Sequence, residues 1–162
     1  SPSFCAAIEK AQQRLRQNHW TSWWSTWADE HGVLVEEHNF TVAWPHRNTI
    51  AFSNATGSVK DSTILVHEIQ PLMDDYGLPP GVTCSIDPWS HERVIFWQQL
   101  AAAALGDAET FWELRTLQTG FEMRVRFMPY KPTEPCLDLG AVESAPHNLT
   151  YTTMRTLLPW WD

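Results

Sequence analysis

Basic residues and long apolar runs are scarce in this chain. Only 11 of the 162 residues are lysine or arginine, against 19 aspartates and glutamates, which gives a formal net charge of -8. No basic cluster exceeds the pair Arg124 and Arg126. We therefore expect neither nucleic acid nor an anionic membrane surface as a partner. No apolar run approaches the roughly 18 residues of a membrane-spanning helix, and we expect no membrane span.

Cysteine is also rare, and the usual catalytic and metal-binding motifs are missing. The cysteines are Cys5, Cys84 and Cys136. They form no CxxC or Cys/His pattern typical of zinc. A secreted protein would hold one disulfide and one further thiol, whereas a cytosolic one would keep all three reduced. No Gly-x-Ser-x-Gly elbow is present. The spacing of His31, His38 and His46 matches no metal template, so we expect neither a metal nor a cofactor.

Tryptophan, in contrast, is abundant, with ten residues. Four of them repeat along one face of a helix, at positions 20, 23, 24 and 27. Each indole can bury roughly 200 Å² and needs a partner for its N–H. This number exceeds what an ordinary core needs, although a helix packed on a sheet also buries one face. The pattern predicts a ligand pocket or surface formed by Trp23, Trp24, Trp27 and Trp44.

Three of the five asparagines begin an N-x-Thr sequon. These are Asn39, Asn54 and Asn148. Chance would place a sequon after roughly one asparagine in ten. The excess predicts glycosylation and a secreted or secretory-pathway protein, with a chance pattern in a cytoplasmic protein as the alternative.

Apolar periodicity and turn residues predict a single α+β domain over residues 1–162, with helices packed on a mostly antiparallel sheet. The expected helices cover residues 6–29 (weakened by Asn18 and Thr21), 62–73 with Ser62 as N-cap and a kink or break at Pro71, 88–105, and 107–118. The expected strands cover residues 33–35 and 40–44 as a hairpin, then 49–52, 82–86, 121–127 and 149–158.

The middle of the chain resembles the N-terminal half of a GNAT-superfamily acyltransferase. The similarity rests on Asn48–Phe52, Gly77–Leu78–Pro79, Asp87–Pro88, Gly120–Phe121, Met123 and Phe127–Met128. The resemblance implies an acetyl-CoA enzyme, whose Gly-rich loop presents backbone N–H groups to pyrophosphate. No segment here has that loop, and Gly106 is followed by the acidic Asp107. The resemblance is therefore limited to half of such a fold, which would need a partner chain.

A group of histidines and carboxylates follows the indole-rich segment. Its candidate catalytic members are Asp29, Glu36, His38 and His46. A histidine beside a carboxylate in an aromatic pocket is suited to proton transfer near neutral pH. In this hypothesis His38 or His46 transfers the proton, and Glu36 or Asp29 orients it. The alternative is a solvated polar surface at a helix end and a strand.

These observations favour a cofactor-free acid/base enzyme, a lyase, isomerase or cyclase of secondary metabolism. Its partner would be a hydrophobic or aromatic small molecule held between indoles. One alternative is a secreted, non-enzymatic ligand-binding or effector module whose tryptophans contact a carbohydrate, a lipid or another protein. Another is half of a GNAT-like acyltransferase. A homo-oligomer is left open in each case.

Overall fold

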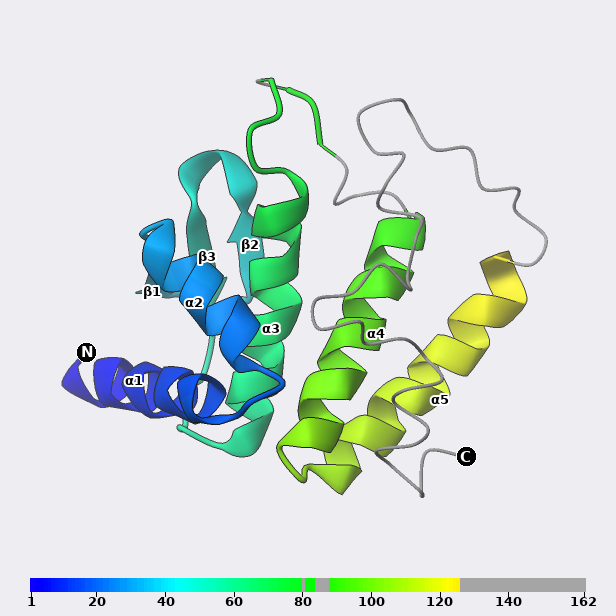
Figure 1. The fold of residues 1–162 in the computed structure, drawn as a ribbon, viewed down its shortest axis with the longest axis horizontal. Coiled ribbons are helices and arrows are strands. Elements are labelled where there is room, and N and C mark those ends of the chain that lie inside the picture. The colour runs from blue at the N-terminus through cyan, green and yellow to red at the C-terminus, as the bar shows by residue number, and fades with distance from the viewer. Residues whose placement is uncertain (80, 84–87, 126–162) are drawn as a thin grey trace.

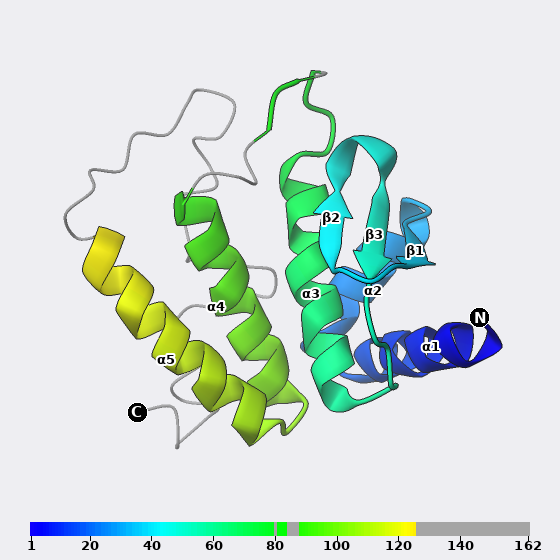
Figure 2. The same ribbon diagram turned by 180° about the vertical axis from the view of Figure 1, so that it is seen from behind.

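The structure is a computed structural model that describes residues 1–79, 81–83 and 88–125, with the backbone alone for residues 88–93 and 118–125. Helix α3 (Val59–Asp74) stands at the centre of the fold (Figure 1). Helices α1 and α2 and a small sheet lie on one side of α3, and helices α4 and α5 lie on the other (Figure 2). This arrangement confirms the predicted α+β class.

The tryptophan-rich segment forms two helices instead of the single helix expected over 6–29. They are α1 (Pro2–Gln17) and α2 (Ser22–Glu30). Asn18 separates them, because its Oδ1 accepts hydrogen bonds from the backbone N–H groups of Trp20 (2.9 Å) and Thr21 (3.1 Å). A side chain that binds backbone donors in this way competes with continuation of the helix.

Three short strands form one mixed sheet with the order β1-β3-β2. They are β1 (Leu34–Glu37), β2 (Val42–Trp44) and β3 (Thr49–Phe52), and the short helix η1 (Pro45–Arg47) links β2 to β3. β1 pairs with β3 in parallel, and β2 pairs with β3 in antiparallel orientation. A mostly antiparallel sheet therefore stays a prediction for the whole chain.

The expected hairpin between residues 33–35 and 40–44 is wrong, because β1 and β2 flank β3 and do not pair with each other. The strands differ in burial. All four residues of β3 are buried, whereas both outer strands carry exposed residues. The fully buried strand takes the centre, where neighbours protect it on both edges.

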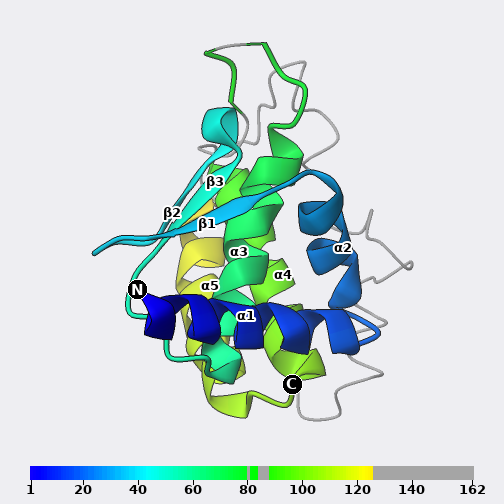
Figure 3. The same ribbon diagram turned by 90° about the vertical axis from the view of Figure 1, so that its left-hand side faces the viewer.

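The sheet has an inner and an outer face, which the register defines. On the inner face Ile50 and Phe52 join the buried cluster that also contains Leu15 and Leu65. Figure 3 shows β2 and β3 beside α3, with β1 crossing in front of α3. The outer face carries the alternate residues, which are Leu34, Glu36, Val42, Trp44, Thr49 and Ala51.

The N-cap of helix α3 lies four residues earlier than expected. Its N-cap is Ser58, whose Oγ accepts from the backbone N–H of Asp61, and not Ser62. Ser62 lies inside the helix and donates to the carbonyl of Ala11 at 3.0 Å. Of the kink or break predicted at Pro71, the break does not occur, because the helix continues through Pro71 to Asp74.

The C-terminal half of the described chain is helical. Helix α4 spans Pro88–Ala104 and helix α5 spans Ala108–Val125. The strand expected over 121–127 is wrong for residues 121–125, which continue α5. Gly120 costs the helix about 1 kcal/mol, but extending a helix that has already formed needs no new nucleus, so α5 continues through it. Among the described residues, no helix combines the length and apolar character needed to cross a membrane.

The structure describes only part of one further expected strand and none of another. Val82 and Thr83 do not form a strand, and residues 84–86 lie outside the described part of the chain. The strand expected over 149–158 lies outside it entirely.

Candidate functional site

The tryptophans of the first indole-rich segment pack into or against the core. Trp24 is fully buried, and its Nε1 donates to Oε1 of Gln70 at 2.9 Å. Its ring lies 5.6 Å from that of Trp97, which is also fully buried. The other predicted ligand-binding residues of this helix, Trp23 and Trp27, are partly buried against the same cluster. Trp24 therefore has a structural role that by itself accounts for its presence.

Trp27 belongs to a separate aromatic group at the end of α2. Its ring stacks on His31 at 4.0 Å, and Tyr76 meets both rings edge-on. Nδ1 of His31 also lies 2.7 Å from the carbonyl oxygen of Trp27. Among the described residues, no ring contact joins this group to Trp44. The structure therefore does not bring the four predicted ligand-binding tryptophans together around one space.

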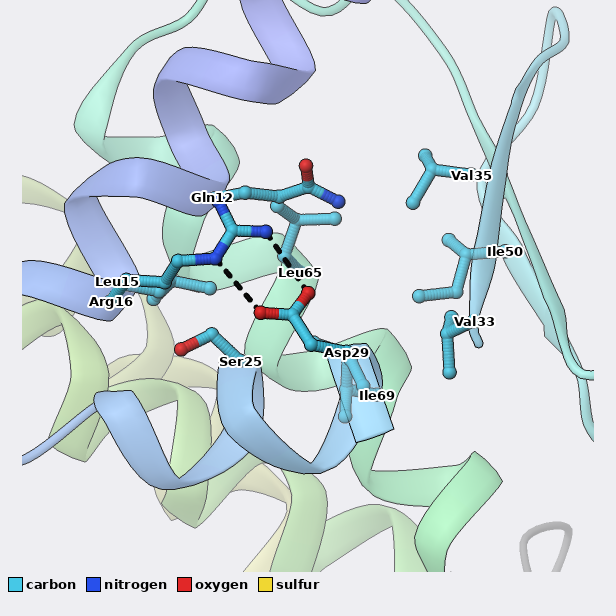
Figure 4. A pocket seen from close by; sticks show the side chains of 11 residues that line it. Gln12, Leu15, Arg16, Ser25, Asp29, Val33, Val35, Ile50, Leu65 and Ile69 are labelled. Carbon is cyan, nitrogen blue, oxygen red and sulfur yellow. Dashed lines mark hydrogen bonds and ion pairs between the residues drawn. The ribbon is translucent and has the colours of Figure 1, made fainter. Parts of the chain in front are cut away.

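The cavity between α1, α2 and the sheet has no tryptophan in its lining (Figure 4). Aliphatic side chains such as Val35, Ile50 and Leu65 form its interior, and Arg16 and Asp29 lie at its polar rim. Its volume is about 20 Å³. A space of that size holds about one water molecule, and it is too small for a metabolite.

Asp29, a predicted catalytic residue, forms a two-pronged ion pair with Arg16. The guanidinium nitrogens Nε and Nη2 donate to its two carboxylate oxygens at 2.9 and 3.0 Å. These hydrogen bonds lower the pKa of Asp29 below its ordinary value. Among the described residues, no contact joins Asp29 to His38 or His46. Its environment therefore favours a permanent charge that ties α1 to α2.

Three of the remaining predicted residues, Glu36, His38 and Trp44, meet on the outer face of the sheet. We call Glu36, His38, Phe40, Trp44 and Arg47 the outer-face cluster. Nε2 of His38 lies 3.1 Å from Oε2 of Glu36, so the predicted pairing of these two residues is present. The His38 ring meets the edge of Trp44 at 5.2 Å and lies 5.1 Å from Phe40.

Arg47 closes the cluster from η1. Its guanidinium carbon stands 4.4 Å from the centre of the Trp44 ring, within cation–π range, and Nη2 lies 3.9 Å from Oε2 of Glu36. His46, the neighbouring predicted catalytic residue, is exposed in η1. Sequence reasoning missed Arg47 and Phe40. The short distance in sequence between Trp44 and Arg47 was the available signal.

Apolar side chains extend this surface to the sheet edges. Leu34 is 60% exposed, Phe40 46% and Val42 36%. Contiguous exposed apolar groups bordered by charges are typical of binding surfaces. The cluster thus combines an aromatic centre, one guanidinium, one carboxylate and an imidazole on a flat strand face.

Glu68 is a second titratable residue that the sequence reading overlooked. It lies on α3 with its side chain 12% exposed, and burial raises its pKa to about 7. The backbone N–H of Ala43 in β2 partly offsets this effect. Its position three residues after Leu65 and four before Leu72 on a helix with an apolar face was the available signal.

The predicted modification sites are accessible where they are described. Asn39 and Asn54 are exposed, and Cys5 is an exposed free thiol. Asn148 and the other two cysteines lie outside the described residues. In the described chain, no three histidine, cysteine, aspartate or glutamate side chains gather as ligands for a metal ion.

Comparison with protein-family models, with curated proteins and with solved structures gives no match to this chain. The resemblance to half of a GNAT-superfamily fold therefore stays a prediction. The function has to be argued from the outer-face cluster itself.

Proposed function

We propose that this chain is a non-catalytic binding module that engages another protein through the outer face of its sheet. The observation that carries the proposal is the aromatic cluster of His38, Phe40 and Trp44, in which Phe40 is exposed and the other two rings are partly buried, with Arg47 stacked over the indole. Such a module is the non-enzymatic binding or effector protein that the sequence offers as an alternative, with its binding site on one face of the sheet.

The composition of the cluster supports a protein partner over a small molecule. Tryptophan, phenylalanine and arginine are enriched at protein interfaces, and tryptophan and arginine supply many of the residues that dominate binding energy. Small-molecule sites are usually concave and bury most of the ligand. The cluster lies on strand residues and exposed loops, and the cavity near Asp29 has only about 20 Å³.

A secreted location is consistent with this module. The sequons at Asn39 and Asn54 lie on exposed parts of the surface, where a glycosyltransferase can reach them. Mass spectrometry of the protein from its own source tests this part of the proposal, since occupied sequons add a glycan mass to the peptides that carry Asn39 and Asn54.

The test compares two tryptophan-to-alanine variants. Trp44→Ala removes the centre of the cluster, whereas Trp112→Ala removes an indole on α5 that is 41% exposed. A partner captured from the source is purified, and its affinity for each variant is measured by calorimetry. We expect Trp44→Ala to weaken binding by about 30-fold or more, as a central interface residue does, and Trp112→Ala to have little effect. Equal affinities for the two variants would contradict the proposal.

A second candidate is the acid/base enzyme, which the hydrogen bond between His38 and Glu36 favours. A carboxylate that accepts from one ring nitrogen fixes the imidazole tautomer and prepares the other nitrogen for proton transfer. The two functions differ in the fate of a small-molecule ligand. A binding module returns the ligand unchanged, whereas the enzyme converts it. The rate of the enzyme should fall by about 10²–10⁴-fold in His38→Ala.

A further inference from the structure

The outer edge of β1 is the free edge of the sheet among the described residues. The strand order β1-β3-β2 leaves β1 with one neighbour, and Figure 3 shows it nearest the viewer, crossing in front of α3. β2 is also an edge strand, but α3 covers it, because Glu68 accepts from the backbone N–H of Ala43. An uncovered edge presents backbone donors and acceptors that another strand can use.

The backbone groups on that edge follow from the pairing with β3. The N–H of Leu34 donates to the carbonyl of Asn48, and the N–H of His38 donates to the carbonyl of Phe52. Backbone groups alternate in direction along a strand, so Leu34, Glu36 and His38 face β3. The N–H and C=O groups of Val35 and Glu37 therefore point away from the sheet.

The side chains along this edge specify the chemistry of an added strand. Leu34 is 60% exposed on the outer face, next to the position where a new strand would lie. Glu36 and Glu37 are 41% and 50% exposed, and Glu37 already accepts from the backbone nitrogen of Ser1 at 2.8 Å and from its Oγ at 3.1 Å. Both contacts of Glu36, with His38 and Arg47, use Oε2, so Oε1 is left for a cation from a partner.

We propose that β1 accepts an extended segment of the partner protein, with alternating apolar and basic residues, as an additional strand beside the outer-face cluster. This inference rests on the proposed function, because the added strand brings its partner onto that face. Backbone hydrogen bonds to Val35 and Glu37 supply the pairing, Leu34 contacts an apolar side chain, and Oε1 of Glu36 selects lysine or arginine. Charge complementarity with a chain of net charge -8 favours this occupant over a second copy of the same chain.

The probe for this inference is a synthetic capped peptide of alternating lysine and valine, with alternating glutamate and valine as its control. Amide hydrogen exchange of the full chain reports pairing without any substitution. We expect the lysine peptide to slow exchange at Val35 and Glu37, and the glutamate peptide to leave it unchanged. Slowed exchange by both peptides, or by neither, would overturn the charge-selected pairing.

Two variants at one position test the backbone bond directly. Glu37→Pro removes the outward N–H, whereas Glu37→Ala removes the same carboxylate and keeps the N–H. We expect Glu37→Pro to bind the lysine peptide about tenfold more weakly than Glu37→Ala, which is the loss of one hydrogen bond. Thermal melting of both variants separates this effect from loss of the fold, and the exchange experiment on the unsubstituted chain decides if Glu37→Pro does not fold.

The variant Trp44→Ala separates this inference from the proposed function. If Trp44→Ala abolishes peptide binding while Glu37→Pro matches Glu37→Ala, the cluster binds and the strand addition is wrong. If Glu37→Pro alone weakens binding, the edge pairs and the proposed role of the cluster is wrong. If light scattering shows a dimer that dissociates in Glu37→Pro, the edge binds a second copy of the chain and the proposed partner is wrong.

Discussion

The protonation of Glu68 is directly linked to the stability of the fold. Its side chain lies between α3 and β2, 3.9 Å from Nε2 of His67, and burial raises its pKa to about 7 from an ordinary value of 4.5. The folded chain therefore keeps this proton over a pH range in which the unfolded chain has lost it. Because the folded state binds more protons there, the free energy of unfolding falls as pH rises.

We predict that this fall is absent in Glu68→Gln, which stays neutral at every pH. Between about pH 4.5 and pH 7 the difference between the original chain and Glu68→Gln should change by about 3 kcal/mol. Urea denaturation of both proteins at several pH values measures it. Groups with the opposite pH dependence, such as Asp29, whose pKa is lowered, contribute equally to both proteins and cancel in the difference. Parallel pH curves for the two proteins would show that Glu68 titrates normally.

At the scale of elements, the junction between α1 and α2 depends on one side chain. Asn18 accepts from two backbone N–H groups through Oδ1, and its Nδ2 donates to the carbonyl of Ala104 at 3.1 Å. It thus holds the turn between the end of α1 and the start of α2 at Ser22, and also fixes the end of α1 to the end of α4.

We predict that Asn18→Ala lowers the free energy of unfolding by about 1–2 kcal/mol, because it removes the three hydrogen bonds of this side chain. Gln17→Ala, one residue earlier at the exposed end of α1, is the matched control and should change it by less than about 0.5 kcal/mol. Chemical denaturation of the three proteins gives both values. A cost at Gln17 equal to that at Asn18 would mean that the junction is held by other contacts.

The helices and the strands differ in how far the sequence predicted them. Apolar periodicity identified most of α1 and α3, and cap and stop residues such as Pro88, Gly106 and Asp107 identified α4 and most of α5, because both signals are visible in local sequence. Strand pairing is decided by distant residues, so nothing near Val35 indicated that it would pair with Ile50 and not with β2. The alternating run at 121–125 predicted a strand from its local pattern, but the preceding helical turns continued through it.

The candidate site was predicted in part for a similar reason. Glu36 and His38 are two residues apart on one strand, and residues with that spacing share a face. Their contact followed from the sequence alone. Asp29 was grouped with them by proximity in the chain, but α2 turns it toward Arg16. The indole pocket was expected from composition, which does not reveal that Trp24 finds its partner in Gln70.

At the scale of the whole molecule, the net charge of -8 governs how a basic partner approaches. We predict that association with the lysine–valine peptide slows by about tenfold or more when salt shortens the screening length from about 10 Å at 0.1 M to about 3 Å at 1 M. Stopped-flow mixing at several salt concentrations measures the rate.

The dissociation rate should depend on salt much less, since apolar contacts of Leu34 and Trp44 control it. Trp44→Ala provides the control, because it should speed dissociation and leave the salt dependence of association unchanged. Association that is independent of salt would show that the acidic character of the chain plays no part in partner selection.

The sequon at Asn39 stands immediately before Phe40 on the same exposed loop. An oligosaccharide attached there would project beside the aromatic surface and act as a steric shield over it. Glycoforms of one chain would then differ in the area they offer to a partner, so the enzymes of the host cell would set the active fraction. Material made in bacteria would present the bare loop in every molecule.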